Sequence, residues 1–375
     1  MEDVAIGNDD LTTNNNNKQK PMKIVVTGNM GYVGPVVVRH LRLRHPEANI
    51  VGIDVGLFAH CLTSRERLPE VMLSEQRFAD VRGLNAADFA GANAVVHLAA
   101  ISNDPIGHRF EAATEEINFR ASVAVAAAAA EAGVKNFVYA SSCSVYGFAA
   151  EGRARKETDA VNPLTAYAKS KIAAEESFRQ MDRRGMTITA LRFATACGMS
   201  DRLRLDLVLN DFVASAMACR EIKVLSDGTP WRPLIDVQDM ARAIDWAVVR
   251  PPDNGGGCLV VNVGSDDWNF QVRELAEAVA GAIPSTTVSI NQDAPPDKRS
   301  YRVDFGLFAR LAPNYLPAMT LSRTIDQLSE GLSAIAFRDA DFRHSQFMRL
   351  NVLDRHISER RLAADLRWIQ DDRRA

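Results

Sequence analysis

The sequence has few cysteines, no long apolar run and no excess of charge of one sign. Its five cysteines are odd in number, scattered and never in a Cys-x-x-Cys pair, which argues against a disulfide framework or a zinc knuckle. The longest apolar candidate, around residues 123–130, falls short of the roughly 18 residues that span a bilayer. Lys plus Arg (44) nearly balance Asp plus Glu (47), so no broad footprint for nucleic acid exists. We therefore expect a soluble cytoplasmic protein without nucleic-acid or membrane partners.

The first twenty residues are polar and include four consecutive asparagines at 14–17. They lack the basic-then-apolar pattern of a secretory signal, so residues 1–20 are expected to form a disordered tail. The chain of 375 residues, 47% of them hydrophobic, is long enough for about two domains of ~150 residues with a large core. The seven histidines nowhere adopt zinc spacing, and we expect no metal.

From residue 23 onward, short runs rich in Val and Ile alternate with longer segments of helical period. This pattern predicts an α/β fold with a doubly wound parallel sheet covered by helices on both faces. After residue 193 the pattern loosens into a smaller, mixed α/β region. Strands are expected at residues 23–27, 50–54, 77–79, 94–98, 136–140, 187–193 and 259–263, and helices at 111–132, 165–181, 206–218 and 238–248.

A glycine-rich turn follows the first predicted strand, with glycines at Gly28, Gly31 and Gly34 before an apolar helix. Such glycines permit a tight turn and let backbone N–H groups approach a pyrophosphate at the helix N-terminus. Asp54 stands twenty positions after Gly34, at the tip of the second strand, where a carboxylate accepts hydrogen bonds from an adenosine ribose and repels a 2'-phosphate. The sequence therefore predicts a dinucleotide site that prefers NAD.

Tyr167 and Lys171 lie four positions apart in a helical segment, so both side chains project from one face. A nearby ammonium and an oxidised nicotinamide would favour the phenolate, and a tyrosine pKa near 7 needs roughly 4 kcal/mol of such stabilisation. Ser142 follows a predicted strand, which places its hydroxyl at the carboxyl edge of the sheet. Taken alone, the Tyr-x-x-x-Lys pattern is common by chance, and its weight comes from this combination.

Taken together, these motifs resemble the extended short-chain dehydrogenase/reductases, specifically the NAD-dependent nucleotide-sugar epimerase/dehydratase family. The resemblance covers roughly residues 23–304. The motifs that carry it, in chain order, are Thr27-Gly28-x-x-Gly31-x-x-Gly34, Asp54, Asp80-Val81, His97-Leu98-Ala99-Ala100, Ser141-Ser142, Val145-Tyr146-Gly147 and Tyr167-x-x-x-Lys171.

The resemblance implies a Rossmann domain at residues 21–195, to which 233–263 returns, and a nucleotide-sugar-binding domain formed by 196–232 and 264–375. It also implies a homodimer joined through two helices, near 111–132 and 163–184.

The resemblance assigns a role to each matching position. Tyr167 would be the general base, Lys171 would hold the nicotinamide ribose and depress the tyrosine pKa, and Ser142 would bind the sugar hydroxyl, with Ser144 as a second hydroxyl. The implied cofactor residues are Gly28, Met30, Gly31, Tyr32, Val33, Gly34, Asp54, Asp80, Val81, Leu98, Ala99, Ala100, Tyr167 and Lys171. Those implied for the substrate are Asn103, Ser142, Arg232 and Arg299, the arginines serving as diphosphate clamps.

The expected reaction is a 4-epimerisation of a nucleotide sugar through a transient keto sugar. Relatives that eliminate water or decarboxylate carry a carboxyl residue at Ser144 or Cys143, so dehydratase chemistry is less favoured. A nucleotide-keto-sugar reductase is the main alternative, and a reductase of steroid-like alcohols or a noncatalytic dinucleotide sensor are others. Cys143 lies one position from where some relatives place a cysteine acid, which favours a packing role for its thiol.

Overall fold

The computed structural model describes residues 21–64, 66–102, 104–147, 153–294 and 300–369. The expected tail at 1–20 lies outside these residues. A seven-stranded sheet, parallel at every pairing, forms the centre of the larger region. Its strands, in spatial order, are β10 (Cys258–Val263), β6 (Thr187–Phe193), β5 (Asn136–Ser142), β4 (Ala94–His97), β1 (Lys23–Thr27), β2 (Asn49–Asp54) and β3 (Glu75–Phe78).

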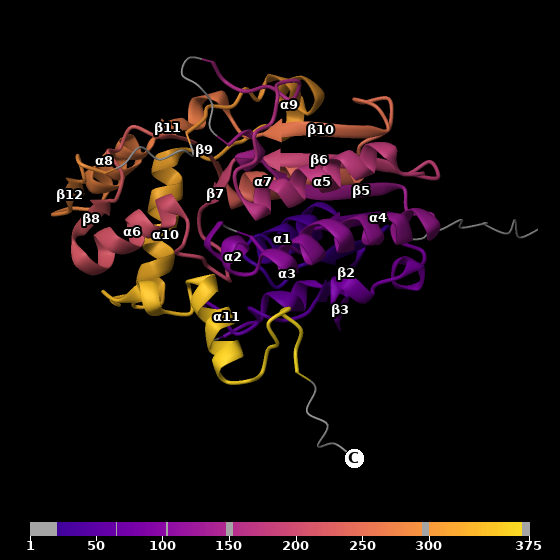
Figure 1. Cartoon of the computed structure of the whole chain (residues 1–375), viewed down its shortest axis with the longest axis horizontal. Helices are drawn as coiled ribbons and strands as arrows, with labels where there is room; N and C mark the ends of the chain where they lie inside the picture. The colour runs from indigo at the N-terminus through magenta and orange to yellow at the C-terminus, as the bar shows by residue number, and fades with distance from the viewer. Residues whose placement is uncertain (1–20, 65, 103, 148–152, 295–299, 370–375) are drawn as a thin grey trace, which may run out of the picture.

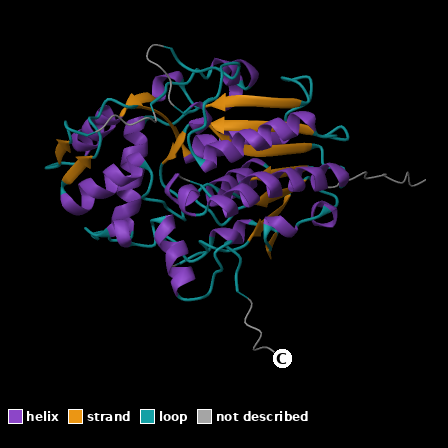
Figure 2. Cartoon of the chain, in the orientation of Figure 1, coloured by secondary structure: helices purple, strands orange, loops and turns teal. Residues whose placement is uncertain are grey.

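Helices cover both faces of this sheet, because alternate strand residues point to opposite sides. Ile24 and Val26 of β1 belong to one buried cluster and Val25 to the other. Figures 1 and 2 show the resulting layers of helix, sheet and helix. This arrangement confirms the predicted doubly wound parallel sheet. The covering helices are α1 (Gly34–Arg44) and α7 (Val237–Val249) on the first face, and α4 (Ser122–Glu131) and α5 (Ala166–Gln180) on the second.

The helix predicted at 111–132 is interrupted. It consists of α3 (Glu111–Glu115), a π-helical stretch at Glu116–Ala121 and α4, ending before Gly133, whose φ is +78°. A π-helical turn re-aims the side chains that follow it and often occurs at functional sites. Here it holds Asn118, whose side chain donates to and accepts from the backbone of Ile101 at 2.7 Å, just beyond β4.

The smaller region contains two short sheets and several helices. β9 (Trp231–Asp236) pairs with β7 (Thr195–Cys197) and β11 (Asn269–Gln271), and β8 (Glu221–Val224) pairs with β12 (Thr287–Ile290). This confirms a mixed α/β character. The remaining helices are α2 (Asp104–Arg109), α6 (Val208–Cys219), α8 (Val272–Ala282), α9 (Gly306–Leu311), α10 (Leu321–Ala334) and α11 (Arg349–Ser358).

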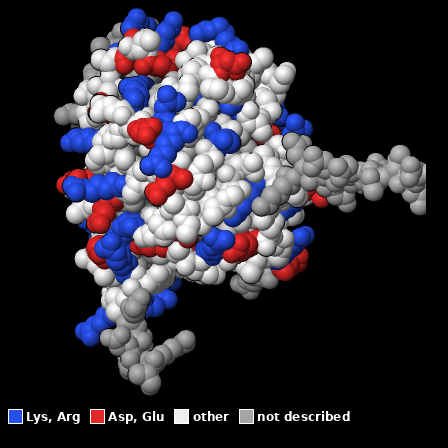
Figure 3. Space-filling model, turned by 90° about the vertical axis from the view of Figure 1, so that its right-hand side faces the viewer, with Lys and Arg blue, Asp and Glu red and all other residues white. Residues whose placement is uncertain are grey.

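The surface carries charge of both signs. Figure 3 views the face at the right of Figure 1, opposite the arrowheads of β6 and β10, and there Lys and Arg side chains are interspersed with Asp and Glu. In the described part of the chain, no helix has the length and apolar character needed to cross a membrane.

Candidate active site

A cavity of about 940 Å³ lies at the carboxyl edge of the large sheet and extends to the smaller region. The chain order reverses between β4 and β1, and open α/β sheets bind ligands at such switch points. Sixteen of the residues predicted from sequence line this cavity: Gly28, Gly31, Tyr32, Val33, Gly34, Asp54, Asp80, Val81, Leu98, Ala99, Ala100, Ser142, Ser144, Tyr167, Lys171 and Arg232. Met30 is not among the lining residues, and Asn103 and Arg299 fall outside the described residues.

The turn between β1 and α1 requires its glycines. Gly28 has a φ of +78°, and a Cβ there would lie 2.5 Å from the backbone nitrogen of Ala99. A Cβ on Gly34 would lie 2.2 Å from the carbonyl oxygen of Asn29. The turn therefore packs closely on the segment that follows β4 and on its own backbone, so that no side chain fits at either position, as a pyrophosphate cradle needs.

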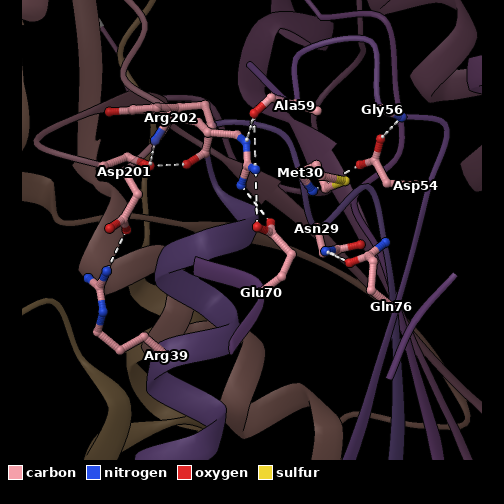
Figure 4. Close-up of polar contacts among 12 residues, drawn as sticks. Asn29, Met30, Arg39, Asp54, Gly56, Ala59, Glu70, Gln76, Asp201 and Arg202 are labelled. Carbon is pink, nitrogen blue, oxygen red and sulfur yellow. Dashed lines mark hydrogen bonds and ion pairs between the residues drawn. The ribbon is translucent and has the colours of Figure 1, made fainter. Parts of the chain in front are cut away.

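Asp54 is held at the tip of β2 by two backbone N–H donors. Met30 donates to Oδ2 at 2.9 Å and Gly56 to Oδ1 at 2.7 Å (Figure 4). Burial raises the pKa of Asp54, and these two hydrogen bonds oppose that rise. Each carboxylate oxygen keeps a further lone pair. The residue therefore fits the acceptor that an adenosine ribose requires.

The loop that follows Asp54 is hydrogen-bonded to the segment that follows β7. Arg202 is fully buried and donates to Glu70 at 2.6 Å and to the carbonyl of Ala59 at 3.2 Å (Figure 4). Asp201, its neighbour in the chain, pairs with Arg39 of α1. These contacts join the loop that follows β2, and helix α1, to the segment after β7.

Tyr167 and Lys171 project from the first turns of α5, which begins at the cap residue Thr165. Lys171 Nζ donates to the carbonyl of Ala140 at 2.7 Å and lies 5.5 Å from the Tyr167 ring centre. Burial raises the pKa of Tyr167 to about 12, against a hydrogen bond with Ser142 and the charge of Arg204. Burial likewise lowers the pKa of Lys171 to about 7. The chain alone therefore leaves the phenol protonated.

A buried ion pair fixes these catalytic candidates to the sheet. Arg192 of β6 donates to Glu175 of α5 at 2.6 Å, and the two side chains are 3% and 1% exposed. Ser141 donates to the same carboxylate at 2.5 Å, and Arg192 also donates to the Tyr146 hydroxyl at 3.0 Å. The pair therefore connects β6, α5 and the end of β5, next to Ser142.

The loop after β5 contains Cys143 and Ser144. Cys143 is buried, its Sγ donates to the carbonyl of Arg192 at 3.1 Å, and burial raises the pKa of its thiol. It does not line the cavity, which supports the packing role. Ser144 does line the cavity, and its buried Oγ has no hydrogen-bond partner among the residues that the structure describes. An orphaned hydroxyl at this place suits a polar ligand.

One residue that lines the cavity, Arg204, was not predicted from the sequence. Arg204 is 7% exposed, forms an ion pair with Asp206 at 2.9 Å and donates to Ser102 at 2.8 Å. It lies close enough to Tyr167 to influence the phenol pKa. None of the sequence motifs includes it.

Two arginines near Trp231 differ in their position relative to the cavity. Arg232 lines the cavity and donates to the carbonyl of Trp231 at 2.9 Å, whereas Arg302 stacks over the Trp231 ring, 4.9 Å from its centre. His97 is buried within hydrogen-bonding distance of Thr27 and Ser122. In the described ranges, no group of three His, Cys, Asp or Glu side chains is arranged to hold a metal ion.

Comparison with known proteins agrees with this geometry. The chain is 27% identical over 270 residues (69% of this chain, 83% of the relative) to the uncharacterized UDP-glucose epimerase YtcB of Bacillus subtilis. It is 30% identical over 273 residues (70% and 83%) to the UDP-glucose 4-epimerase of Mycolicibacterium smegmatis. The UDP-glucose-4-epimerase of Stenotrophomonas maltophila, solved with NAD and formylated UDP-arabinopyranose, superposes with a TM-score of 0.72 at 22% identity, covering 84% of this chain and 99% of that one.

The family model of the NAD dependent epimerase/dehydratase family matches residues 24–264, more than half of the chain. The cavity is lined by the glycine turn, by Asp54, which is placed to accept from a ribose, and by Tyr167 and Lys171. This chain is accordingly an enzyme of the NAD-dependent epimerase/dehydratase family, with NAD as its cofactor.

Proposed function

We propose that this protein is a nucleotide-sugar 4-epimerase. The observation that carries the proposal is the lining of the cavity beside Tyr167, where Ser142 and Ser144 supply hydroxyls and no carboxyl occupies positions 143 and 144. Elimination of water needs an additional acid/base pair, whereas 4-epimerisation needs only the shared machinery. NAD, when bound, accepts the hydride from the sugar and returns it to the opposite face.

The chain's own residues then have defined tasks. The Tyr167 oxygen takes the proton of the sugar hydroxyl and gives it back to the keto oxygen. Ser142, in hydrogen-bond contact with Tyr167, orients that hydroxyl. Arg232 lines the cavity and binds the diphosphate, since a guanidinium matches phosphate oxygens.

The experiment is to incubate the purified protein with a panel of nucleotide sugars and to resolve the products by NMR, with and without added NADH. An epimerase forms the C4 epimer without added NADH. Stoichiometric consumption of NADH with a keto-sugar substrate would instead identify a reductase. Tyr167→Phe is the matched control, because it keeps the ring and removes the base.

A dehydratase would be recognised by a 4-keto-6-deoxy product. Asp104 lines the cavity, and its charge raises the pKa of Tyr167. Its carboxyl is therefore the candidate acid/base for such an elimination. If such a product forms and Asp104→Asn abolishes it while cofactor binding is kept, the 4-epimerase proposal is wrong.

We also propose a homodimer joined through α4 and α5. Arg120, Ala124, Ala127 and Glu131 are exposed at helical spacing along the first of the two helical segments, and its alanines would let another helix approach closely. Light scattering after size exclusion should give twice the chain mass, and Ala127→Arg should reduce it to one chain mass. A wild-type monomer at micromolar concentration would refute the proposal.

A further inference from the structure

The C-terminal segment, residues 349–369, packs against the large sheet. Leu353, Leu362 and Leu366 are at most 2% exposed and belong to the same buried cluster as Val51 and Ile53 of β2. Figure 1 shows this stretch, with α11, in yellow below the strands β2 and β3. The segment was assigned from the family resemblance to the nucleotide-sugar half, yet its contacts lie on the cofactor side.

Three side chains of the segment hold the loop that follows Asp54. The Trp368 indole donates to the carbonyl of Val55 at 2.6 Å, and His356 Nε2 lies 3.1 Å from the carbonyl of Leu57. The Arg349 guanidinium lies 5.0 Å from the ring centre of Phe58. Because Asp54 ends β2, these contacts fix the backbone next to the ribose acceptor.

A second set of contacts lies at the end of β3. Arg82, with a side chain 5% exposed, pairs with Asp80 and donates to the carbonyl of Asp365 at 2.7 Å and to that of Leu366 at 3.4 Å. Leu366 has a φ of +61°, which leucine rarely adopts. Its side chain lines the cavity in company with Asp80 and Val81.

These two sets of contacts converge on one part of the cavity. Asp54 marks the adenosine ribose by the general rule for such sites, and Asp80 and Val81, which the resemblance assigns to the cofactor, line the same cavity. We propose that residues 349–369 form the outer wall of the adenosine pocket and retain NAD between turnovers. NAD leaves this pocket only when the segment, held by Trp368 and by Arg82, detaches from the sheet.

The test measures the exchange of bound NAD in the absence of any sugar. Its result is therefore independent of whether the enzyme is an epimerase, a reductase or a dehydratase. Chains ending at Arg361 and at Ile369 are loaded with isotope-labelled NAD and chased with excess unlabelled NAD. The chain ending at Ile369 keeps the described segment whole and is the matched control. We expect the chain ending at Arg361 to release NAD at least tenfold faster, with an unchanged far-ultraviolet spectrum.

Point variants decide the matter if the shortened chain does not fold. Trp368→Phe keeps an aromatic ring beside His356 but removes the donor to Val55, and Leu366→Ser removes the apolar wall. Each should release NAD at least threefold faster, whereas Glu359→Gln, an exposed position in the same segment, should match the wild type. Release rates within twofold of wild type for both Trp368→Phe and Leu366→Ser overturn the proposal.

Discussion

Replacing one partner of the Arg192–Glu175 pair should destabilise the fold more than any surface change. Glu175→Gln keeps the shape of the side chain and removes its charge. The guanidinium then stays in a site where it is 3% exposed, with the Tyr146 hydroxyl as a neutral partner. A buried charge without its counter-charge is costly because the low-dielectric interior does not solvate it.

The expected loss follows from this geometry. Breaking a buried pair by removing one member costs about 3–5 kcal/mol of unfolding free energy, and Arg192→Met should cost a similar amount. The double variant Glu175→Gln/Arg192→Met leaves no buried charge but leaves the buried amide at position 175 partly unpaired, at about 1–3 kcal/mol. Its loss should therefore lie at least ~2 kcal/mol below the sum of the two single losses.

Urea unfolding followed by far-ultraviolet circular dichroism measures each free energy, with the cofactor removed from every variant. Glu75→Gln is the control, because it breaks an exposed ion pair. The side chains of Glu75 and its partner Arg77 are 48% and 33% exposed, and exposed pairs contribute ~1 kcal/mol or less to the unfolding free energy. A loss below ~1 kcal/mol for Glu175→Gln would refute the argument, as would additivity of the two single losses in the double variant.

Four further outcomes are expected. Tyr167→Phe should retain NAD and lower kcat at least ~100-fold, the usual contribution of a general base. Asp54→Ala should weaken NAD binding relative to NADP in equilibrium titrations, because the ribose loses its acceptor. Burial lowers the pKa of Lys171 to about 7, so between pH 7 and about 10 the unfolded chain holds a proton that the folded chain has lost. Cofactor-free Lys171→Met should therefore be more stable than wild type at pH 7, and this difference in unfolding free energy should shrink as the pH rises to about 10. Cys143, buried and with its thiol pKa raised, should resist iodoacetamide in the native protein and react after unfolding.

The sheet and the cofactor turn were predictable because their signals are local. Strands β1 and β6 have the predicted bounds, since short runs of β-branched and other apolar residues between turn residues favour a buried sheet. The glycines of the turn are required by contacts within one strand–helix unit and with the segment just after β4. The π-helical interruption of the helix at 111–132 gave no signal, because it depends on the clamp between Asn118 and Ile101.

The parts of the site that sequence did not reveal depend on contacts between distant segments. Arg82 meets Asp365 across 283 positions, and neither residue belongs to a motif. Arg204 stands between two leucines outside every motif, and a single arginine in such a place is typical of a surface. Only the folded chain shows that its guanidinium is buried beside Asp206 and Ser102.

The protonation of Tyr167 connects the fold to the chemistry. Moving its pKa from about 12 to ~7 requires roughly 7 kcal/mol. A protonated Lys171, whose Nζ lies 5.5 Å from the ring centre, would supply roughly 3 kcal/mol at an effective dielectric constant of about 20, which is less than half of this amount. The rest would have to come from the positive charge of an oxidised nicotinamide. Under the proposed mechanism, Tyr167 would therefore act as a base only with the oxidised cofactor bound.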